Sequence, residues 1–298
     1  MSPLRPIVRA GVRARFILSL IVMALCGAVS LDVAAGTGSR PLAVPSALLT
    51  QDGQPALWRV TMTAPFLPAR PGSPSLHTPR LVGCVDSGRR FVNHGPVTGR
   101  RIALTFDDGP WSQTAQFLTV LERYRVPATF FEVGEHLATF GRRGAIERRM
   151  LADGDMIGDH TWNHANVSAG GRFAVREISQ TAVAIKQATH GFTPCLFRAP
   201  FGAVGAGLLR TATSLGFKTI QWDIDPRDWA TPGVGAIYAN VMANAHPGAI
   251  ILQHDGGGNR AQTLSALPRE ITSLKARGYH FVTITQLLGM RLIYRWSR

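Results

Sequence analysis

The sequence of 298 residues predicts an α/β fold built from repeated strand–helix units. From about residue 98 to residue 290, short runs rich in β-branched and aromatic residues alternate with longer amphipathic runs, and polar residues gather where the short runs end. No internal repeat or low-complexity tract occurs in this region. The alternation indicates parallel strands joined by helices, which leaves a barrel or a doubly wound sheet as the architecture.

Seven short runs are expected to be strands, and six longer runs are expected to be helices. The strands are expected at 102–106, 128–131, 156–158, 195–197, 218–222, 249–252 and 280–284. The helices are expected at 113–125, 143–153, 173–190, 205–215, 234–245 and 262–277.

Polar side chains follow five of the expected strands directly. They are Asp107 and Asp108, then His160, then Arg198, then Asp225 and Asp228, and then His254. The carboxyl ends of the strands in a βα barrel converge on one face, so these side chains are expected to share a pocket. Helix caps and turns explain one or two such positions but not five segments, and the pattern therefore favours a barrel.

The first 35 residues resemble an export signal. Four arginines precede the apolar run 16–31, and small residues follow it in the pattern Val33-x-Ala35. Cleavage after Ala35 is expected, and an uncleaved membrane anchor is the alternative, because 16 residues fall just short of the ~20 that span a bilayer. Either outcome places the protein outside the cell or in the cell envelope.

The composition, with 45% hydrophobic and 17% charged residues, is typical of a globular chain. Residues 36–97 are expected to be a Pro/Gly/Ser-rich linker and lead-in, 98–290 the catalytic domain, and 291–298 a C-terminal tail. Cys84 and Cys195 can pair in an oxidising compartment, although their spacing does not show whether they do.

The chain is strongly basic, with a formal net charge of +14, and residues 36–298 keep 28 Lys plus Arg against 17 Asp plus Glu. Outside the cytoplasm such a charge favours anionic envelope polymers or membrane surfaces as partners. Solvated basic faces without a specific partner explain it equally well. No nucleic-acid-binding motif occurs, so no nucleic-acid partner is expected.

The side chains after the first and third expected strands have the composition of a metal site. Asp107 and Asp108 are adjacent and point in different directions, so one can bind a metal while the other faces the reacting centre. His160 and His164 share a face if they lie on a helical turn. Two imidazoles and the Asp108 carboxylate leave coordination positions open, which is typical of a catalytic site.

In order and spacing, five segments resemble the motifs of the polysaccharide deacetylase family, which is carbohydrate esterase family four and is also called the NodB homology domain. The matching segments are Thr105-Phe-Asp-Asp-Gly109, His160-Thr-x-x-His164, Arg198-x-Pro-Phe201, Asp225-x-x-Asp228-Trp229 and Leu252-x-His254. The resemblance covers about two thirds of the chain. It implies a distorted (β/α) barrel of about seven strands and a divalent metal, Zn²⁺ above all.

The resemblance also implies a role for each matching residue. Asp107 resembles the general base and His254 the general acid, while Asp108, His160 and His164 resemble the metal ligands. Arg198 would orient Asp107, and Asp228 would either tune His254 or bridge to Arg198. The substrate groove would be lined by Phe201, which stands where many members have Tyr, and by Trp229 and Leu252.

The implied activity is hydrolysis of N-acetyl groups from an amino-sugar polysaccharide, with peptidoglycan or a chitin-type oligosaccharide as substrate and acetate as product. The alternatives are deacetylation of O-acetylated xylan and a non-catalytic glycan-binding protein on the same fold. Two histidines and a carboxylate also describe non-haem iron oxygenases. Those enzymes usually have a double-stranded β-helix, which the strand–helix alternation argues against.

Overall fold

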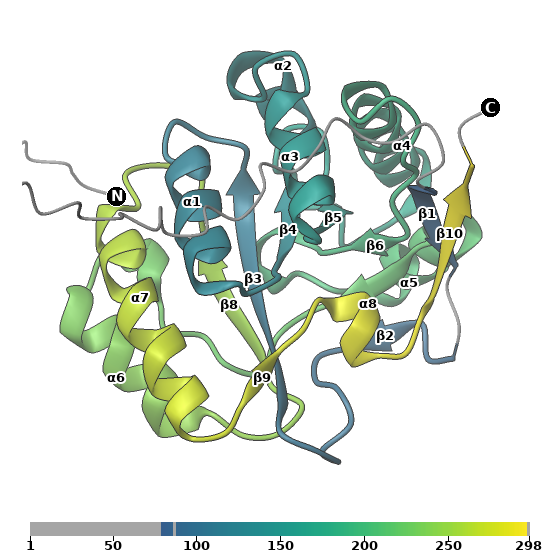
Figure 1. Cartoon of the computed structure of the whole chain (residues 1–298). Coiled ribbons are helices and arrows are strands. Elements are labelled where there is room, and N and C mark those ends of the chain that lie inside the picture. The colour runs from purple at the N-terminus through teal and green to yellow at the C-terminus, as the bar shows by residue number, and fades with distance from the viewer. Residues whose placement is uncertain (1–78, 86–87, 297–298) are drawn as a thin grey trace, which may run out of the picture. The chain divides into compact units, whose positions relative to one another are not determined.

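The computed structural model describes residues 79–85 and 88–296, which form an α/β domain (Figure 1). Its strands are β1 (Arg80–Val85), β2 (Phe91–Val92), β3 (Arg101–Gly109), β4 (Thr129–Glu132), β5 (Met156–Asp159), β6 (Leu196–Phe197), β7 (Lys218–Ile220), β8 (Ile250–His254), β9 (His280–Phe281) and β10 (Arg291–Arg295). Its helices are α1 (Thr114–Tyr124), α2 (Gly134–Phe140), α3 (Ala145–Asp153), α4 (Gly171–Ala188), α5 (Ala206–Ser214), α6 (Val234–Asn244), α7 (Ala261–Ala276) and α8 (Ile284–Leu287). Single 3₁₀ turns form η2 (Pro200–Gly202) and η3 (Asp228–Ala230).

The main sheet is parallel throughout and has the strand order β2-β7-β6-β5-β4-β3-β8, with β9 paired to the beginning of β3. An isolated parallel bridge joins Ile224, just after β7, to Ile251 of β8. Because this bridge connects the two sides of the sheet, the strands form a barrel that is closed irregularly. The predicted distorted (β/α) barrel is thereby confirmed.

Helices cover the outside of the barrel, as expected for βα units (Figure 1). The helix α1 packs against α3 and α7, α4 against α2 and α5, and α6 against α7. Between the sheet and α1, the rings of Phe106 and Phe130 stack at 5.2 Å, and Phe117 meets Phe106 edge to face at 5.3 Å. All three side chains are fully buried. This core fixes β3, which carries the Asp107–Asp108 pair, and its neighbour β4.

Three strands lie outside the residues 98–290 expected for the catalytic domain. They are β1 and β2 within the expected lead-in, and β10 within the expected tail. The strands β1 and β10 pair in an antiparallel ribbon, and a disulfide joins Cys84 of β1 to Cys195, the residue before β6. The ribbon and the disulfide therefore attach both ends of the described chain to the barrel.

All seven predicted strands are present, with shifted boundaries. The last is shorter than predicted, because Thr283 caps α8 through a reciprocal pair of hydrogen bonds with Gln286 and so ends the strand after Phe281. The helices α2 and α8 were not predicted. They have only 7 and 4 residues, too few for a periodic pattern to be visible in the sequence.

Among residues 79–85 and 88–296, no helix is both long and apolar enough to cross a membrane. The predicted signal peptide or anchor at 1–35 lies outside the described residues.

Candidate active site

The Asp107–Asp108 pair lies at the carboxyl end of β3, where the register with β4 shifts between Asp107 and Gly109. Asp108 has a φ of 70°, in the left-handed region, so the backbone turns and the two carboxylates point to different sides. Gly256 and Gly257 pack closely against Asp108: a Cβ on Gly256 would lie 2.0 Å from the Asp108 carbonyl oxygen. The loop after β8 therefore has room for only glycine at this point.

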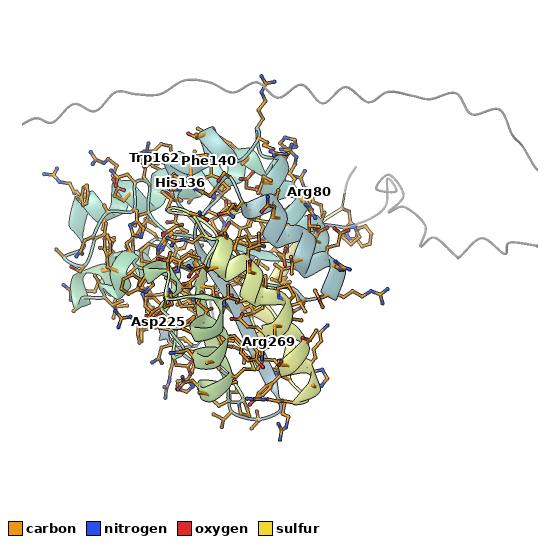
Figure 2. All side chains as sticks on the ribbon, turned by 90° about the vertical axis from the view of Figure 1, so that its left-hand side faces the viewer. Arg80, His136, Phe140, Trp162, Asp225 and Arg269 are labelled. Carbon is orange, nitrogen blue, oxygen red and sulfur yellow. A yellow bond between two sulfur atoms is a disulfide. The ribbon has the colours of Figure 1, made fainter. Side chains whose placement is uncertain are left out.

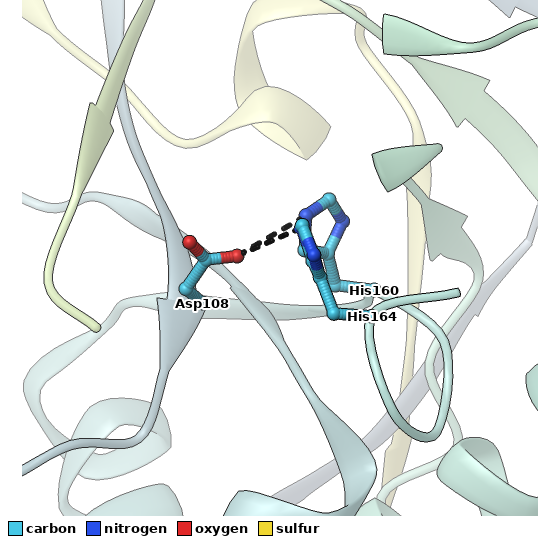
Figure 3. Close-up of side chains that lie close together, drawn as sticks. All are labelled: Asp108, His160 and His164. Carbon is cyan, nitrogen blue, oxygen red and sulfur yellow. Dashed lines mark ion pairs between the residues drawn. The ribbon is translucent and has the colours of Figure 1, made fainter. Parts of the chain in front are cut away.

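Asp108, His160 and His164 converge as predicted (Figure 3). The Asp108 Oδ1 lies 3.6 Å from the Nε2 of His160 and 3.1 Å from that of His164, and the three ligand atoms all lie within 4.8 Å of one another. The expected helical turn is wrong, however, because residues 160–164 form an irregular loop in which Thr161 and His164 have positive φ angles of 70° and 58°. Tertiary contacts bring the imidazoles together where helical geometry does not.

His160 is held in the tautomer that a metal ligand needs. Its Nδ1 donates a hydrogen bond to the carbonyl oxygen of Arg198 at 2.8 Å, which leaves the Nε2 lone pair directed at Asp108. Burial is the largest influence on this side chain and lowers its pKa to about 3. His160 is therefore neutral at physiological pH, as metal binding requires.

The loop that carries both histidines is attached to α4 by a buried carboxylate. The Oε2 of Glu177 accepts hydrogen bonds from the backbone N–H groups of Trp162 at 3.1 Å and Asn163 at 3.2 Å. The Oδ1 of Asp159 accepts a third, from the N–H of Thr161 at 2.9 Å. Three consecutive backbone donors between the two histidines are thus bound by side chains, which holds this irregular loop in position.

The site satisfies the requirements for a divalent metal. The Oδ1 of Asp108 is buried and has no hydrogen-bond partner among the described residues, although it faces two imidazole nitrogens. An unsatisfied buried carboxylate oxygen is costly unless a cation neutralises it. Two nitrogens and one oxygen are a ligand set that binds zinc and leaves a coordination position for water or substrate.

Arg198 binds Asp107, as predicted. Its Nη1 donates to the Asp107 Oδ1 at 2.7 Å and to the Thr105 hydroxyl at 2.8 Å, while Nε and Nη2 donate to the carbonyl oxygens of Ile220 and Gln221. The guanidinium also lies 4.1 Å from the ring centroid of Phe131. Arg198 is fully buried, so these contacts fix it completely, and through it the Asp107 carboxylate.

The second oxygen of Asp107 is directed toward the candidate metal ligands. The Oδ2 lies 3.7 Å from the His160 Nε2, whereas Oδ1 is bound to Arg198. Burial raises the pKa of Asp107 and the Arg198 charge opposes that rise. A carboxylate with a raised pKa and one oxygen held in place is suited to accept a proton.

Asp228 contacts His254 rather than Arg198, which decides between the two expected roles. The Asp228 Oδ1 lies 2.8 Å from the His254 Nδ1, and Oδ2 accepts hydrogen bonds from the His254 N–H and the Thr263 hydroxyl. Burial alone would lower the pKa of His254, but the hydrogen bond and charge of Asp228 outweigh it and raise the pKa to about 9. His254 is therefore protonated near neutral pH and can donate a proton.

The three predicted groove residues occupy different depths. Phe201 is 70% exposed, has a φ of 60°, and its ring centroid lies 4.5 Å from that of His164. Trp229 is 47% exposed, and the Arg227 guanidinium lies 5.2 Å from its ring centroid. Leu252 is buried and lies two residues before His254, on the same side of β8. The two aromatic rings are exposed, whereas Leu252 lies below His254 in the barrel.

Sequence reasoning missed a set of supporting residues. The Nδ1 of His136 on α2 donates to the carbonyl oxygen of Asp108 at 2.9 Å, and its ring lies 4.8 Å from that of Trp111 and 6.1 Å from that of Phe140. His136, Phe140 and Trp162 are labelled close together in the upper part of the domain in Figure 2. A lone histidine in an unpredicted helix has no spacing pattern that identifies it. Asp225, in contrast, accepts only the N–H of Arg227 in a local turn.

Comparison with known proteins agrees with this geometry. Residues 94–220 match the family model described as polysaccharide deacetylase. A peptidoglycan-N-acetylglucosamine deacetylase of Bacillus cereus is 38% identical over 198 residues, which are 65% of this chain and 90% of the relative. A chitooligosaccharide deacetylase of a Bradyrhizobium species is also 38% identical, over 209 residues, 65% of this chain and 94% of the relative.

A solved structure shows the same fold. The crystal structure of a peptidoglycan N-acetylglucosamine deacetylase has a TM-score of 0.63 and 33% sequence identity, and the match covers 67% of this chain and 93% of that chain. The family-model match includes Asp107, Asp108 and His160, and this chain covers 90% and 94% of the two relatives at 38% identity. The chain therefore belongs to the polysaccharide deacetylase family of hydrolases, carbohydrate esterase family four.

Proposed function

We propose that this protein removes N-acetyl groups from an amino-sugar polymer in the cell envelope, by metal-dependent hydrolysis that releases acetate. The observation that carries the proposal is the arrangement of Asp107, which is held by Arg198 through one oxygen and directs the other toward the Asp108–His160–His164 triad. His254 completes the site with a nitrogen that is protonated near neutral pH.

The proposed metal is Zn²⁺, held by Asp108, His160 and His164. When bound, it supplies Lewis-acid polarisation of the acetamide carbonyl and a lower pKa for the attacking water. The same three side chains suit other divalent ions of similar size and ligand preference, so metal analysis of the purified protein identifies the ion.

The remaining steps belong to the side chains of this chain. Asp107 accepts a proton from the water as it attacks the carbonyl carbon, and Arg198 keeps the accepting carboxylate in position. His254 then donates its proton to the departing amine, and the Asp228 carboxylate stabilises the charged imidazole before that transfer. Positioned acid and base groups of this kind each contribute about 10²- to 10⁴-fold to the rate.

The proposed substrate groove is lined by Phe201, Trp229 and Leu252. Flat exposed rings of Phe201 and Trp229 are suited to the apolar faces of sugar residues. The ring of Phe201 lies beside that of His164, and we propose the Phe201 backbone N–H as a donor to the oxyanion. The names of the relatives favour peptidoglycan or chitin-type oligosaccharides as substrates, and the basic chain favours an anionic wall.

The proposal is tested by acetate release together with metal content. Asp107→Asn is expected to abolish acetate release from N-acetylated chitooligosaccharides and peptidoglycan while retaining the metal, and His160→Ala is expected to lose both. Asp153→Asn, on the outer helix α3, is the matched control and should keep full activity. Near-normal turnover in Asp107→Asn contradicts the assignment of the base. Release from O-acetylated xylan alone contradicts the proposed substrate class.

A further inference from the structure

The barrel has a second face at the amino ends of its strands, opposite the active site. From Arg101 to Asp108 the strand β3 advances seven residues, so the two faces lie about 23 Å apart. The loops that enter the strands β3, β4, β5, β8 and β9 form this second face, together with the carboxyl ends of α1 and α7 (Figure 1). We call it the amino-end face.

The amino-end face carries many exposed cations. They are Arg100 before β3, Arg123 and Arg125 at the end of α1, and Lys275 and Arg277 at the end of α7. Each of these side chains is exposed. The electrostatic potential of this face is therefore set by positive charge unless carboxylates neutralise it.

Carboxylates near this face are already occupied. Asp155, the only acidic residue in the loops entering β3, β4, β5, β8 and β9, is buried and accepts the N–H of Ala128 at 2.7 Å. The Asp223 Oδ2 lies 3.0 Å from His246, and Glu122 and Asp153 both pair with Arg149. None of the ion pairs in the described part of the chain uses Arg125 or Lys275.

Several of the cations surround a cavity. An open cavity of about 380 Å³ is lined by Arg125, Lys275, Gly278, Tyr279, His280 and Phe281. The side chain of Arg125 has no hydrogen bond or ion pair with any described residue, and Lys275 donates only to the Tyr124 carbonyl oxygen, at 2.5 Å. That last bond caps the carboxyl end of α1 and leaves two ammonium hydrogens for another acceptor.

A second open cavity, of about 340 Å³, is lined in part by the exposed Arg89 and by His94 of the loop that enters β3. Exposed Arg and Lys side chains spread over this side of the barrel suit a ligand with repeated negative charges better than a single small anion. Membrane-binding surfaces insert large exposed apolar side chains into lipid. In the described loops that enter β3, β4, β5, β8 and β9, Val97 is the only such side chain.

We propose that the amino-end face binds a phosphate-bearing polyanionic polymer through Arg125, Lys275 and the neighbouring arginines. Guanidinium and ammonium groups are the side chains that bind phosphate oxygens most strongly. Because the catalytic face lies at the other ends of the strands, the enzyme can hold such a polymer while its active site remains accessible. This inference does not depend on the proposed substrate.

The test uses the full chain and a long-chain inorganic polyphosphate, with binding measured at low and at physiological salt. Arg125→Asn with Lys275→Gln removes two charges conservatively, because Asn tolerates the left-handed backbone of residue 125 (φ 51°) and Gln can still donate to Tyr124. The matched control is Arg172→Gln with Arg210→Gln, which removes the same charge from exposed positions on α4 and α5.

The wild type is expected to bind polyphosphate with an affinity that falls steeply as salt rises. The Arg125/Lys275 variant should bind at least tenfold more weakly, the control should bind like the wild type, and both should release acetate at the wild-type rate. Equal weakening of variant and control would show that net charge alone is responsible and would overturn the proposal. Binding to phosphatidylglycerol vesicles without binding to polyphosphate would overturn it in favour of a membrane surface.

Discussion

The Asp228 carboxylate receives three hydrogen bonds, from the His254 Nδ1, the His254 N–H and the Thr263 hydroxyl. Both of its oxygens are used, and Asp228 is buried. Asp228 therefore fixes the orientation of the His254 imidazole, and together with the charges of Asp107 and Asp108 it raises the pKa of His254. The sequence motif placed Asp228 in the site, but only the contacts show that it acts on His254.

We predict that Asp228→Asn moves the alkaline limb of the pH–rate profile to lower pH. In the wild type, activity that depends on protonated His254 should fall as pH rises through about 9, because Asp228, with smaller contributions from Asp107 and Asp108, raises the pKa of His254 to that value. A neutral Asn removes the charge, so the imidazole loses its proton at lower pH. The pH dependence of kcat measures this shift, and an unmoved limb would exclude His254 as the acid.

The same ionisation affects stability. The raised pKa of His254 means that its pairing with Asp228 stabilises the fold fully below the ordinary imidazole value of 6.5, and the stabilisation is lost as pH rises through about 9. Asp228→Asn should remove this part of the pH dependence of unfolding.

Arg198 is a buried cation whose loss should cost both stability and activity. Arg198→Met keeps apolar volume but leaves Asp107 buried without its partner, which is expected to lower the free energy of unfolding by about 3–5 kcal/mol. Denaturant unfolding measures this loss. Acetate release by the remaining folded protein should also fall, because Asp107 is no longer oriented. The double variant Arg198→Met/Asp107→Asn should recover part of the stability without recovering activity.

At the scale of the elements, the loop between β5 and α4 shows where sequence patterns are insufficient. An i, i+4 histidine pair predicts a helical turn, yet Thr161 and His164 have left-handed φ angles and the loop is irregular. Hydrogen bonds from the backbone N–H groups of the loop to the Glu177 and Asp159 carboxylates replace those of a helix. Glu177 lies on α4, which packs beside the loop, 15 residues after Trp162 and 14 residues after Asn163 in the sequence. Its role therefore depends on how this helix packs against the loop.

We expect Glu177→Ala to weaken metal binding by about 10- to 100-fold, the range found for residues that orient metal ligands. The change leaves the N–H groups of Trp162 and Asn163 without an acceptor and loosens the loop between His160 and His164. Competition with a chromogenic chelator measures the affinity. Glu177→Gln, whose amide oxygen can still accept these hydrogen bonds, is the control and should retain most of the affinity. Unchanged metal binding in Glu177→Ala would show that the loop is held by other contacts.

At the scale of the whole molecule, the disulfide joins segments 111 residues apart in sequence. Cys84 lies in β1, close to the residues that precede the described domain, and Cys195 immediately precedes β6. A disulfide that closes a loop of this length strongly restricts the conformations of the unfolded chain. The β1–β10 ribbon also holds both ends of the described chain, but its strands are exposed at several positions. The disulfide therefore adds a covalent link to this ribbon.

Cys84→Ser with Cys195→Ser is predicted to lower the free energy of unfolding by about 4 kcal/mol, while kcat at 25 °C stays near the wild-type value because the bond lies outside the Asp107–His254 site. Urea unfolding with and without a reducing agent measures the effect. Reduction should destabilise the wild type and leave the double variant unchanged. Sensitivity of the double variant to the reducing agent would contradict this account.

The sequence by itself predicted the βα barrel, the positions of its main strands along the chain and the side chains of the candidate metal site, because hydrophobic periodicity and side-chain chemistry are local properties. It also identified Asp107, Arg198, Asp228 and His254 as one site, since the carboxyl ends of parallel strands converge. Only the tertiary structure decided that Asp228 pairs with His254, that His136 and Glu177 hold the ligand loops, and that Cys84 reaches Cys195. These contacts form only when helices and loops pack on the barrel. No local sequence pattern encodes that packing.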